Sequence, residues 1–239
     1  MKKILIAALA VLSLTVGSVA YAAEPIQGTV VAINQVEADV QKTVRVYGNG
    51  YLIGTGFFIK GGYIITAEHS FRIHKPTTLS YEDGSGAYGT AELVKLDPTL
   101  DLAILKTDTY KEHPYFELAE YPDLTELTII GNPQKAYFEK RTGKITSFHK
   151  WITISSPDTL LSATYRMTST AYSTPGFSGG PAIQNGKVIG VAVGGPKPGA
   201  TDELSILVKL DDLKSFIEGA IGDESKRVAG ISETTAIID

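Results

Sequence analysis

Three short segments of the chain contain residue types that can cooperate in nucleophilic catalysis. His69 ends an apolar run typical of a β-strand, Asp101 opens another such run, and Ser178 lies in the glycine-rich segment 175–181, PGFSGGP. A serine hydroxyl is a poor nucleophile at neutral pH, so it needs a base within hydrogen-bond reach and a partner that orients this base. We therefore take these three residues as candidates for a catalytic triad.

The glycines around Ser178 suit acyl transfer. Glycine lets the backbone adopt unusual dihedral angles, so a tight turn can present the hydroxyl while several N–H groups point toward one place. Such donors stabilise the oxyanion of acyl transfer, and the loss of one costs about 3–4 kcal/mol. We expect the amides of Gly176 and Ser178 to form this oxyanion hole.

The order of the three residues along the chain separates the known serine hydrolase folds. The segment also fits the G-x-S-x-G turn of α/β-hydrolases, but in that fold the histidine follows the serine. All four histidines precede Ser178: His69, His74, His113 and His149. The subtilisin order needs an aspartate before the histidine, and only Asp39 precedes His69, in a weak context. The order His, Asp, Ser that remains is that of the chymotrypsin-like fold.

The elements that must position these residues are mostly short strands. β-branched and aromatic residues gather in short runs that glycine-rich turns separate, which predicts an all-β sandwich or pair of barrels. These runs cover residues 40–47, 51–59, 63–66, 77–81, 88–96, 102–106, 127–130, 142–148, 160–168 and 187–193. The one good helical pattern covers residues 211–221 and ends at Gly222. The stretch 110–123 has little periodicity and separates two β halves.

The N-terminal segment has the pattern of an export signal. Two lysines precede an apolar run, and the small residues Ala20 and Ala22 form a cleavage site, so residues 1–22 are a predicted signal peptide. The alternative is a membrane anchor, but the apolar run is short for a span and no second one follows. Removal of residues 1–22 changes the formal charge from −4 to −6. An acidic chain argues against nucleic-acid binding. The absence of cysteine excludes disulfides and thiolate sites.

With these motifs in place, the chain resembles the trypsin-like serine protease superfamily, most closely the protease domain of the bacterial HtrA/Deg group. The resemblance runs over about residues 40–221. The matching segments are 54–59 (GTGFFI), 62–69 (GYIITAEH), 97–106 (DPTLDLAILK), 131–133 (GNP), 175–181 (PGFSGGP) and 186–191 (GKVIGV). Asp97 is a second carboxylate in the third segment, and the apolar run after Asp101 makes Asp101 the better match.

The resemblance implies an all-β fold of two perpendicular six-stranded β-barrels with the active site between them and a C-terminal α-helix. His69, Asp101 and Ser178 then take the catalytic roles. The expected organisation is a signal peptide at 1–22, an N-terminal segment at 23–39, a first barrel with the histidine and aspartate at 40–112, a linker at 113–125, a second barrel with the serine at 126–210, the helix at 211–222 and a flexible tail at 223–239.

Two features depart from the family pattern. Relatives usually have Asn or Asp before the serine, and trypsin-like zymogens use an acidic residue there to bind the freed N-terminus, whereas this chain has Phe177. Activation by that ion pair is therefore not expected, and the ring could change how the oxyanion loop is ordered. Only about 18 residues follow the helix, so we expect no PDZ domain. Relatives form trimers through N-terminal segments, which leaves a homo-oligomer open.

The resemblance also places the pocket for the residue before the scissile bond. Tyr172 takes the floor position, and Val193, Gly194 and Gly195 lie on the opposite wall. With no acidic floor and no histidine on this wall, we expect small to medium apolar side chains to be preferred. Tyr172 could instead narrow or fill the pocket.

The sequence therefore predicts an exported serine endopeptidase, periplasmic or secreted, that cleaves protein or peptide substrates through an acyl-enzyme. No cofactor or metal is expected, because His69 and His74 lie five apart and no third ligand is evident. No nucleic acid and no stable membrane span after signal removal are expected. The alternative is a catalytically silent or partner-activated module of the same fold that binds or chaperones other proteins. We expect His113 and His149 to be surface or loop residues and Trp151 to take part in core and barrel packing.

Overall fold

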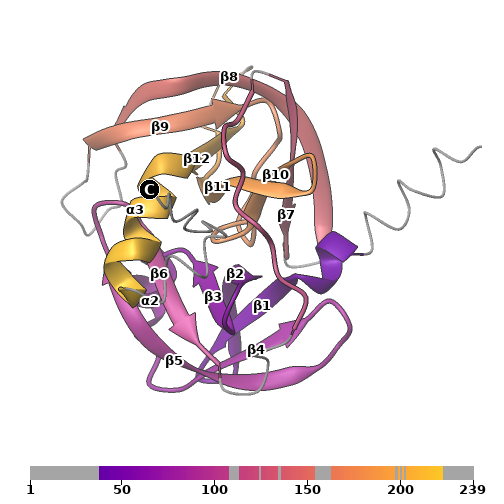
Figure 1. Ribbon diagram of the computed structural model, residues 1–239, viewed down its shortest axis with the longest axis vertical. Helices are drawn as coiled ribbons and strands as arrows, with labels where there is room; N and C mark the ends of the chain where they lie inside the picture. The colour runs from indigo at the N-terminus through magenta and orange to yellow at the C-terminus, as the bar shows by residue number, and fades with distance from the viewer. Residues whose placement is uncertain are drawn as a thin grey trace, which may run out of the picture.

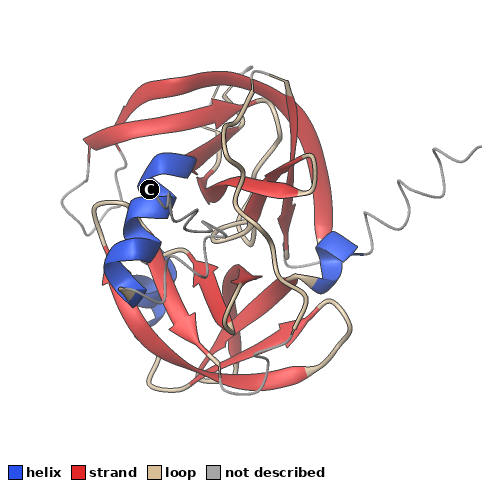
Figure 2. Cartoon of the chain, viewed as in Figure 1, coloured by secondary structure: helices blue, strands red, loops and turns tan. Residues whose placement is uncertain are grey.

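The computed structural model describes residues 38–107, 113–123, 125–133, 136–153, 163–196, 199, 201 and 203–222. This part of the chain forms two closed antiparallel barrels of six strands each, stacked one on the other (Figure 1). The expectation of an all-β fold with two six-stranded barrels is confirmed, and strands dominate the molecule (Figure 2). Residues 1–37 and 223–239, which include the predicted signal peptide and tail, lie outside the described residues.

The first barrel has the strand order β1-β2-β3-β6-β5-β4. Its strands are β1 (Thr43–Gly48), β2 (Tyr51–Ile59), β3 (Tyr63–Thr66), β4 (Leu79–Asp83), β5 (Tyr88–Asp97) and β6 (Leu102–Lys106). Asn49 and Gly50 both have positive φ and join β1 to β2 as a two-residue turn. Positive φ at both positions defines the type I′ turn, which matches the twist of a hairpin. Phe58 and Tyr81 meet edge to face in the buried interior.

The second barrel has the strand order β10-β11-β12-β9-β8-β7. Its strands are β7 (Glu126–Gly131), β8 (Glu139–Thr153), β9 (Ala163–Ser169), β10 (Pro181–Gln184), β11 (Lys187–Gly194) and β12 (Ser205–Lys209). β10 and β12 were not expected from the sequence. Both are short, and β10 begins at a proline, so neither shows the alternation of apolar and polar residues that marks a half-buried strand.

Two named helices accompany the barrels. α3 (Leu210–Ile221) agrees with the predicted helix and buries Leu213, Phe216 and Ile217. It packs against β11 and β12 of the second barrel and against β5 and β6 of the first, so it spans the junction. α2 (His69–His74) has only six residues and was not predicted, because one helical turn is too short to show a period. None of the helices in the described part of the chain is long and apolar enough to cross a membrane.

Two local expectations are wrong. Residues 38–41 form a helical turn, so the first strand begins at Thr43 and not at residue 40. Trp151 is 57% exposed, because it lies on the outer face of β8, where it meets Tyr165 on β9 edge to face. His113 lies in a loop, as expected, but its side chain is only 8% exposed, because its ring packs against Phe58 with ring centroids 4.3 Å apart. Residue type alone does not say which face of a barrel strand points inward.

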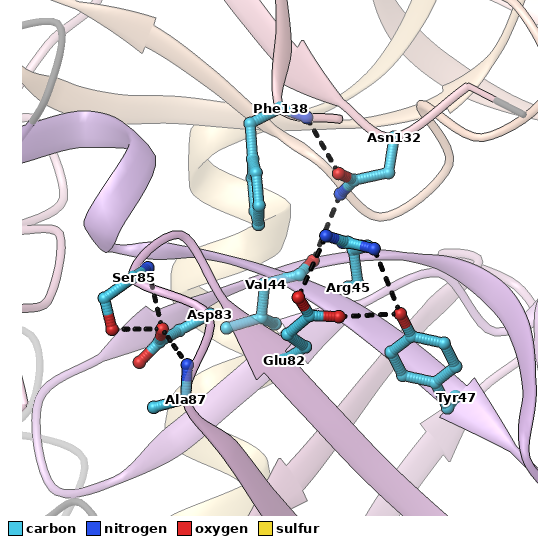
Figure 3. Close-up of polar contacts among 9 residues, drawn as sticks. All are labelled: Val44, Arg45, Tyr47, Glu82, Asp83, Ser85, Ala87, Asn132 and Phe138. Atoms are coloured by element: carbon cyan, nitrogen blue, oxygen red, sulfur yellow. Dashed lines mark hydrogen bonds and ion pairs between the residues drawn. The ribbon is translucent and has the colours of Figure 1, made fainter. Parts of the chain in front are cut away.

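Asp83 ends β4 and organises both the following turn and the segment that leaves the first barrel. Its Oδ1 accepts the N–H groups of Ser85 and Ala87 and the Ser85 hydroxyl (Figure 3). Its Oδ2 lies 2.7 Å from Nε2 of His113. Burial by itself would raise the pKa of the Asp83 carboxyl, but these hydrogen bonds outweigh it and hold the pKa below its ordinary value.

The lowered pKa of Asp83 predicts acid-sensitive stability. The folded state holds the proton less tightly than the unfolded chain, so this stabilisation is complete above about pH 4, the pKa of an unfolded aspartate, and is lost as the pH falls through the lowered pKa. Asp83→Asn should lower the free energy of unfolding at pH 7 by about 1–3 kcal/mol and flatten its decrease on acidification. Urea unfolding at a series of pH values measures both. Glu120→Gln, at an exposed carboxylate, is the control, and equal acid slopes for wild type and Asp83→Asn would contradict the assignment.

Candidate active site

A pocket of about 260 Å³ lies where the two barrels meet. The first barrel contributes the β2 segment from Leu52 to Gly54 and four residues of α2: His69, Ser70, Ile73 and His74. The second barrel contributes Asn132, Pro175, Gly176 and Ser178. The structure thus brings His69 and Ser178, which are 109 positions apart in the sequence, to the wall of one pocket.

The side chain of His69 is oriented by Asp101. Asp101 Oδ2 lies 2.8 Å from His69 Nδ1, and Oδ1 accepts the backbone N–H of His69 at 2.8 Å. This N–H is at the start of α2, where a helix has no internal acceptor, so one carboxylate fixes both the ring and the helix terminus. A carboxylate can only accept, so the proton of the neutral ring is on Nδ1. Nε2 is then left with its lone pair free to act as a base.

Asp97 and Asp101 have different roles. Oδ1 of Asp97 accepts the N–H groups of Thr99 and Leu100, both at 2.9 Å, which closes the loop between β5 and β6. Asp101 ends this loop with φ +60° and is 5% exposed. A non-glycine residue in the left-handed region is uncommon and is kept there only by its surroundings. Asp101, and not Asp97, is therefore the carboxylate that reaches His69.

The backbone before Ser178 forms a defined turn. The N–H of Phe177 donates to the carbonyl of Thr174 at 3.0 Å, with Pro175 and Gly176 between them. Gly176 has φ +103°, which makes this a type II turn, whereas a type I turn has negative φ at that position. The central peptide, which carries the N–H of Gly176, faces opposite ways in the two turn types. Glycine is needed here to reach this conformation.

The N–H groups that follow this turn divide into two sets. Phe177, Gly179 and Gly180 donate to the backbone carbonyls of Thr174, Ala192 and Phe177, respectively. The N–H groups of Gly176 and Ser178 have no acceptor within the described part of the chain. These are the two donors that the sequence predicts for the oxyanion hole, and the loop leaves both available.

Thr55 of β2 attaches this loop to the first barrel. Its N–H donates to the carbonyl of Ser178 at 2.9 Å, and its hydroxyl donates to the carbonyl of Gly176 at 2.6 Å. The approach is close, because a Cβ on Gly179 would lie 2.1 Å from the carbonyl oxygen of Thr55. Thr55 is fully buried, so these bonds are shielded from water.

Asn132 completes this attachment. Its backbone N–H donates to both the Gly176 carbonyl and the Thr55 hydroxyl, each at 3.0 Å, and its Nδ2 also reaches that hydroxyl. Its side-chain amide connects the N–H of Phe138 to the carbonyl of Val44 in β1 (Figure 3). The sequence motifs contained Thr55 and Asn132, but their roles were missed, because a buried side chain that holds a backbone carbonyl leaves no pattern of its own.

Phe177 is an anchor of this loop. Its side chain is fully buried, and its ring covers Gly131, where an added Cβ would lie 2.5 Å from ring atoms. The guanidinium of Arg141 lies over the same ring, 4.6 Å from its centroid. Arg141 also donates to the carbonyl of Tyr172 at 2.7 Å. Apolar burial and a cation–π contact thus hold the side chain directly before Ser178.

The predicted specificity residues lie apart from the pocket beside His69, since none of them lines it. Tyr172 is 49% exposed, Val193 is buried, and Gly194 and Gly195 are half-buried. The two walls are close together, because a Cβ on Gly195 would lie 2.6 Å from the carbonyl oxygen of Ser173. His74 lines the pocket beside His69, but within the described residues no group of three or more His, Asp or Glu side chains could hold a metal ion.

Comparison with known proteins gives the family of this chain. Residues 54–191, more than half of the chain, match the family model of the trypsin-like peptidase domain. A protein of Bartonella henselae described as a "probable periplasmic serine endoprotease DegP-like" is 29% identical over 143 residues. This match covers 58% of the chain but only 27% of the relative, so the chain spans about a quarter of that protein's length.

Solved structures share the fold. The Rv3671c protease from M. tuberculosis in its active form superposes with a TM-score of 0.66 at 23% identity, over 90% of this chain and 95% of that one. A serine endoprotease from Yersinia pestis gives a TM-score of 0.65 at 21% identity, over 80% of this chain and 67% of that one. The two barrels, the His69–Asp101 pair facing the pocket that Ser178 lines, and the match to the family model lead to one conclusion: the chain belongs to the trypsin-like peptidase family.

Proposed function

We propose that this protein is an exported serine endopeptidase that cleaves peptide bonds with His69, Asp101 and Ser178. The observation that carries the proposal is the orientation of His69. Its Nδ1 is held by Asp101, which leaves Nε2 as the basic nitrogen in the pocket that Ser178 lines. A serine hydroxyl becomes a useful nucleophile only beside such a base.

The reaction proceeds in two halves. Ser178 Oγ attacks the peptide carbonyl carbon as Nε2 of His69 takes the hydroxyl proton. The tetrahedral intermediate collapses with cleavage of the C–N bond, and His69 returns the proton to the departing amine, which leaves an acyl group on Ser178. Water then attacks this ester with His69 again as the base, and the acid product leaves. Asp101 keeps the ring in place and stabilises its charged form in both halves.

The amides of Gly176 and Ser178 stabilise the oxyanion in both intermediates. Their N–H groups are unused within the described residues, and the type II turn sets the direction of the first of them. Pre-oriented donors of this kind need no reorganisation when charge develops, which is why they contribute strongly to acyl transfer. The Gly176 carbonyl accepts from both Thr55 and Asn132, so the loop is held in this form before substrate arrives.

The burial of Phe177 supports an active enzyme over the silent or partner-activated alternative. A disordered oxyanion loop would leave this ring without fixed contacts, whereas Gly131 and Arg141 enclose it. The loop therefore needs no ion pair with a freed N-terminus to become ordered.

The substrates and location follow from the family and the N-terminal sequence. Protein or peptide substrates of a trypsin-like peptidase bind across the junction of the barrels, with Tyr172, Val193, Gly194 and Gly195 around the residue before the scissile bond. Tyr172 and the close approach of Gly195 to Ser173 favour a small apolar side chain there. The signal-like segment 1–22 and the periplasmic description of the DegP-like relative support export. A homo-oligomer is compatible with this assignment.

The direct test of the proposal is covalent labelling. A fluorophosphonate should attach once per molecule of purified protein, seen as an increase in mass, and should block peptide cleavage, because only an activated serine reacts with it. Ser178→Ala should abolish both labelling and cleavage, while Ser173→Ala is the control at a neighbouring buried serine and should still be labelled. A folded wild-type protein with no serine-dependent labelling would reject the enzyme, and labelling that requires added peptide would favour the partner-activated form.

The role of the Thr55 hydroxyl gives a second prediction. Thr55→Val keeps the shape and the backbone N–H but removes the bond to the Gly176 carbonyl, so the turn before Ser178 loosens. We expect kcat to fall about 10- to 100-fold, less than the 10²–10³-fold typical for loss of an oxyanion donor, with KM little changed.

Thr55→Ser is the matched control, because it keeps the hydroxyl and should retain most of the activity. Steady-state kinetics on one peptide substrate, with thermal unfolding to verify the fold, makes the comparison. Equal kcat for Thr55→Val and Thr55→Ser would show that the hydroxyl does not hold the loop.

A further inference from the structure

We propose that Arg166, a buried arginine of the second barrel, is a positioning residue that holds Asp101 against His69. The inference rests on the proposed function, because it gives Asp101 its role in the reaction. Arg166 lies in β9 and is 0% exposed, and it is the largest of the fully buried side chains in the described part of the chain. Neither the sequence motifs nor the catalytic steps assign it a role.

Arg166 reaches across the junction of the barrels to the loop that carries Asp101. Its Nη1 donates to the carbonyl of Leu100 at 2.8 Å, and its Nη2 donates to the carbonyl of Thr99 at 3.2 Å. These are the two residues directly before Asp101. The planar guanidinium can hold two carbonyls at a fixed spacing, which a lysine ammonium cannot do in the same way.

The same two residues are held from their other side. The N–H groups of Thr99 and Leu100 donate to Asp97, so each of these residues has both its N–H and its carbonyl bound. After Asp101, the chain enters β6, which pairs with β3 and β5. Asp101 is thus fixed on both sides, and this fixation maintains its left-handed φ of +60°.

Three carboxylates favour the positive charge of Arg166 at this buried position. Burial lowers the pKa of the guanidinium, and the carboxylates of Asp101, Asp212 and Asp97 act in the opposite direction. Arginine nevertheless keeps its charge in proteins. A buried cation is costly unless anions or hydrogen bonds compensate it. These carboxylates lie at the end of β5 (Asp97), at the end of the following loop (Asp101) and in α3 (Asp212).

The chemistry therefore depends on a contact between the barrels that is not part of the triad. His69 and Asp101 belong to the first barrel, and Arg166, which binds the loop before Asp101, belongs to the second, as does Ser178. A carboxylate displaced by about 1 Å can cost 10²-fold in rate, because the base is then misaligned with the nucleophile.

Two variants separate geometry from charge. Arg166→Met keeps much of the volume but removes the charge and both hydrogen bonds, and Arg166→Lys keeps the charge but holds one carbonyl at most. We expect kcat to fall about 10- to 100-fold in Arg166→Met and less in Arg166→Lys, with KM within about twofold of wild type. Asp83→Asn is the control for general destabilisation, because it weakens the first barrel away from the site and should leave kcat unchanged.

A second readout needs no catalysis. The proton between His69 Nδ1 and Asp101 gives a low-field signal in the proton NMR spectrum, assigned through its loss in His69→Gln. In Arg166→Met this signal should shift, or disappear because the proton exchanges with solvent. In Arg166→Lys the signal should lie between those of the wild type and Arg166→Met. If Arg166→Met fails to fold, the same comparison is made between Arg166→Lys and wild type.

The outcomes are distinct. A folded Arg166→Met protein with an unchanged signal overturns the inference, even if kcat falls, because Arg166 would then act elsewhere. An unchanged kcat in an active enzyme overturns it as well. A third outcome separates the two proposals. If the NMR signal is present in the wild-type protein and absent from Arg166→Met, but the wild-type protein is neither labelled by the fluorophosphonate nor able to cleave peptides, the positioning role is supported and the proposed protease function is rejected.

Discussion

The contact on which this site depends most is the attachment of the serine loop of one barrel to strand β2 of the other. The N–H of Thr55 donates to the carbonyl of Ser178, and its hydroxyl donates to the carbonyl of Gly176. The backbone N–H of Asn132 donates to the same Gly176 carbonyl and to the Thr55 hydroxyl. Each barrel is closed by its own six strands, but neither contains all three residues of the proposed triad. Arg166 makes the reciprocal connection, from the second barrel to the loop of Asp101. The junction therefore positions the proposed base and the proposed nucleophile through polar contacts in both directions.

The fold could be predicted, and candidate site residues could be proposed, because both leave local signals. Turn residues and β-branched runs marked most strands, and the order of His69, Asp101 and Ser178 selected one serine hydrolase fold. Residues whose function depends on distant contacts could not be found in this way. Arg166 lies in a β-run with no motif around it, and its role depends on two carbonyls 66 and 67 positions away. The outward direction of Trp151 and the burial of His113 likewise depend on the closed barrels.

The residue directly before the serine can be held in place either by an ion pair or, as Phe177 is, by apolar packing. An acidic residue before the serine can be held by an ion pair, which depends on pH and on a free N-terminus. Here an aromatic ring is held by burial against Gly131 and by the guanidinium of Arg141. Apolar burial of this kind forms when the chain folds and needs no proteolytic cleavage. The loop geometry is therefore a property of the folded chain itself.

The most direct test of the account is a crystal structure of the protein with a peptide boronic acid bound. We predict a covalent bond from Ser178 Oγ to boron, a boronate oxygen within hydrogen-bond distance of the N–H groups of both Gly176 and Ser178, and His69 still held by Asp101. A boronate that binds without a bond to Ser178, or an oxygen that faces away from these two amides, would contradict the account.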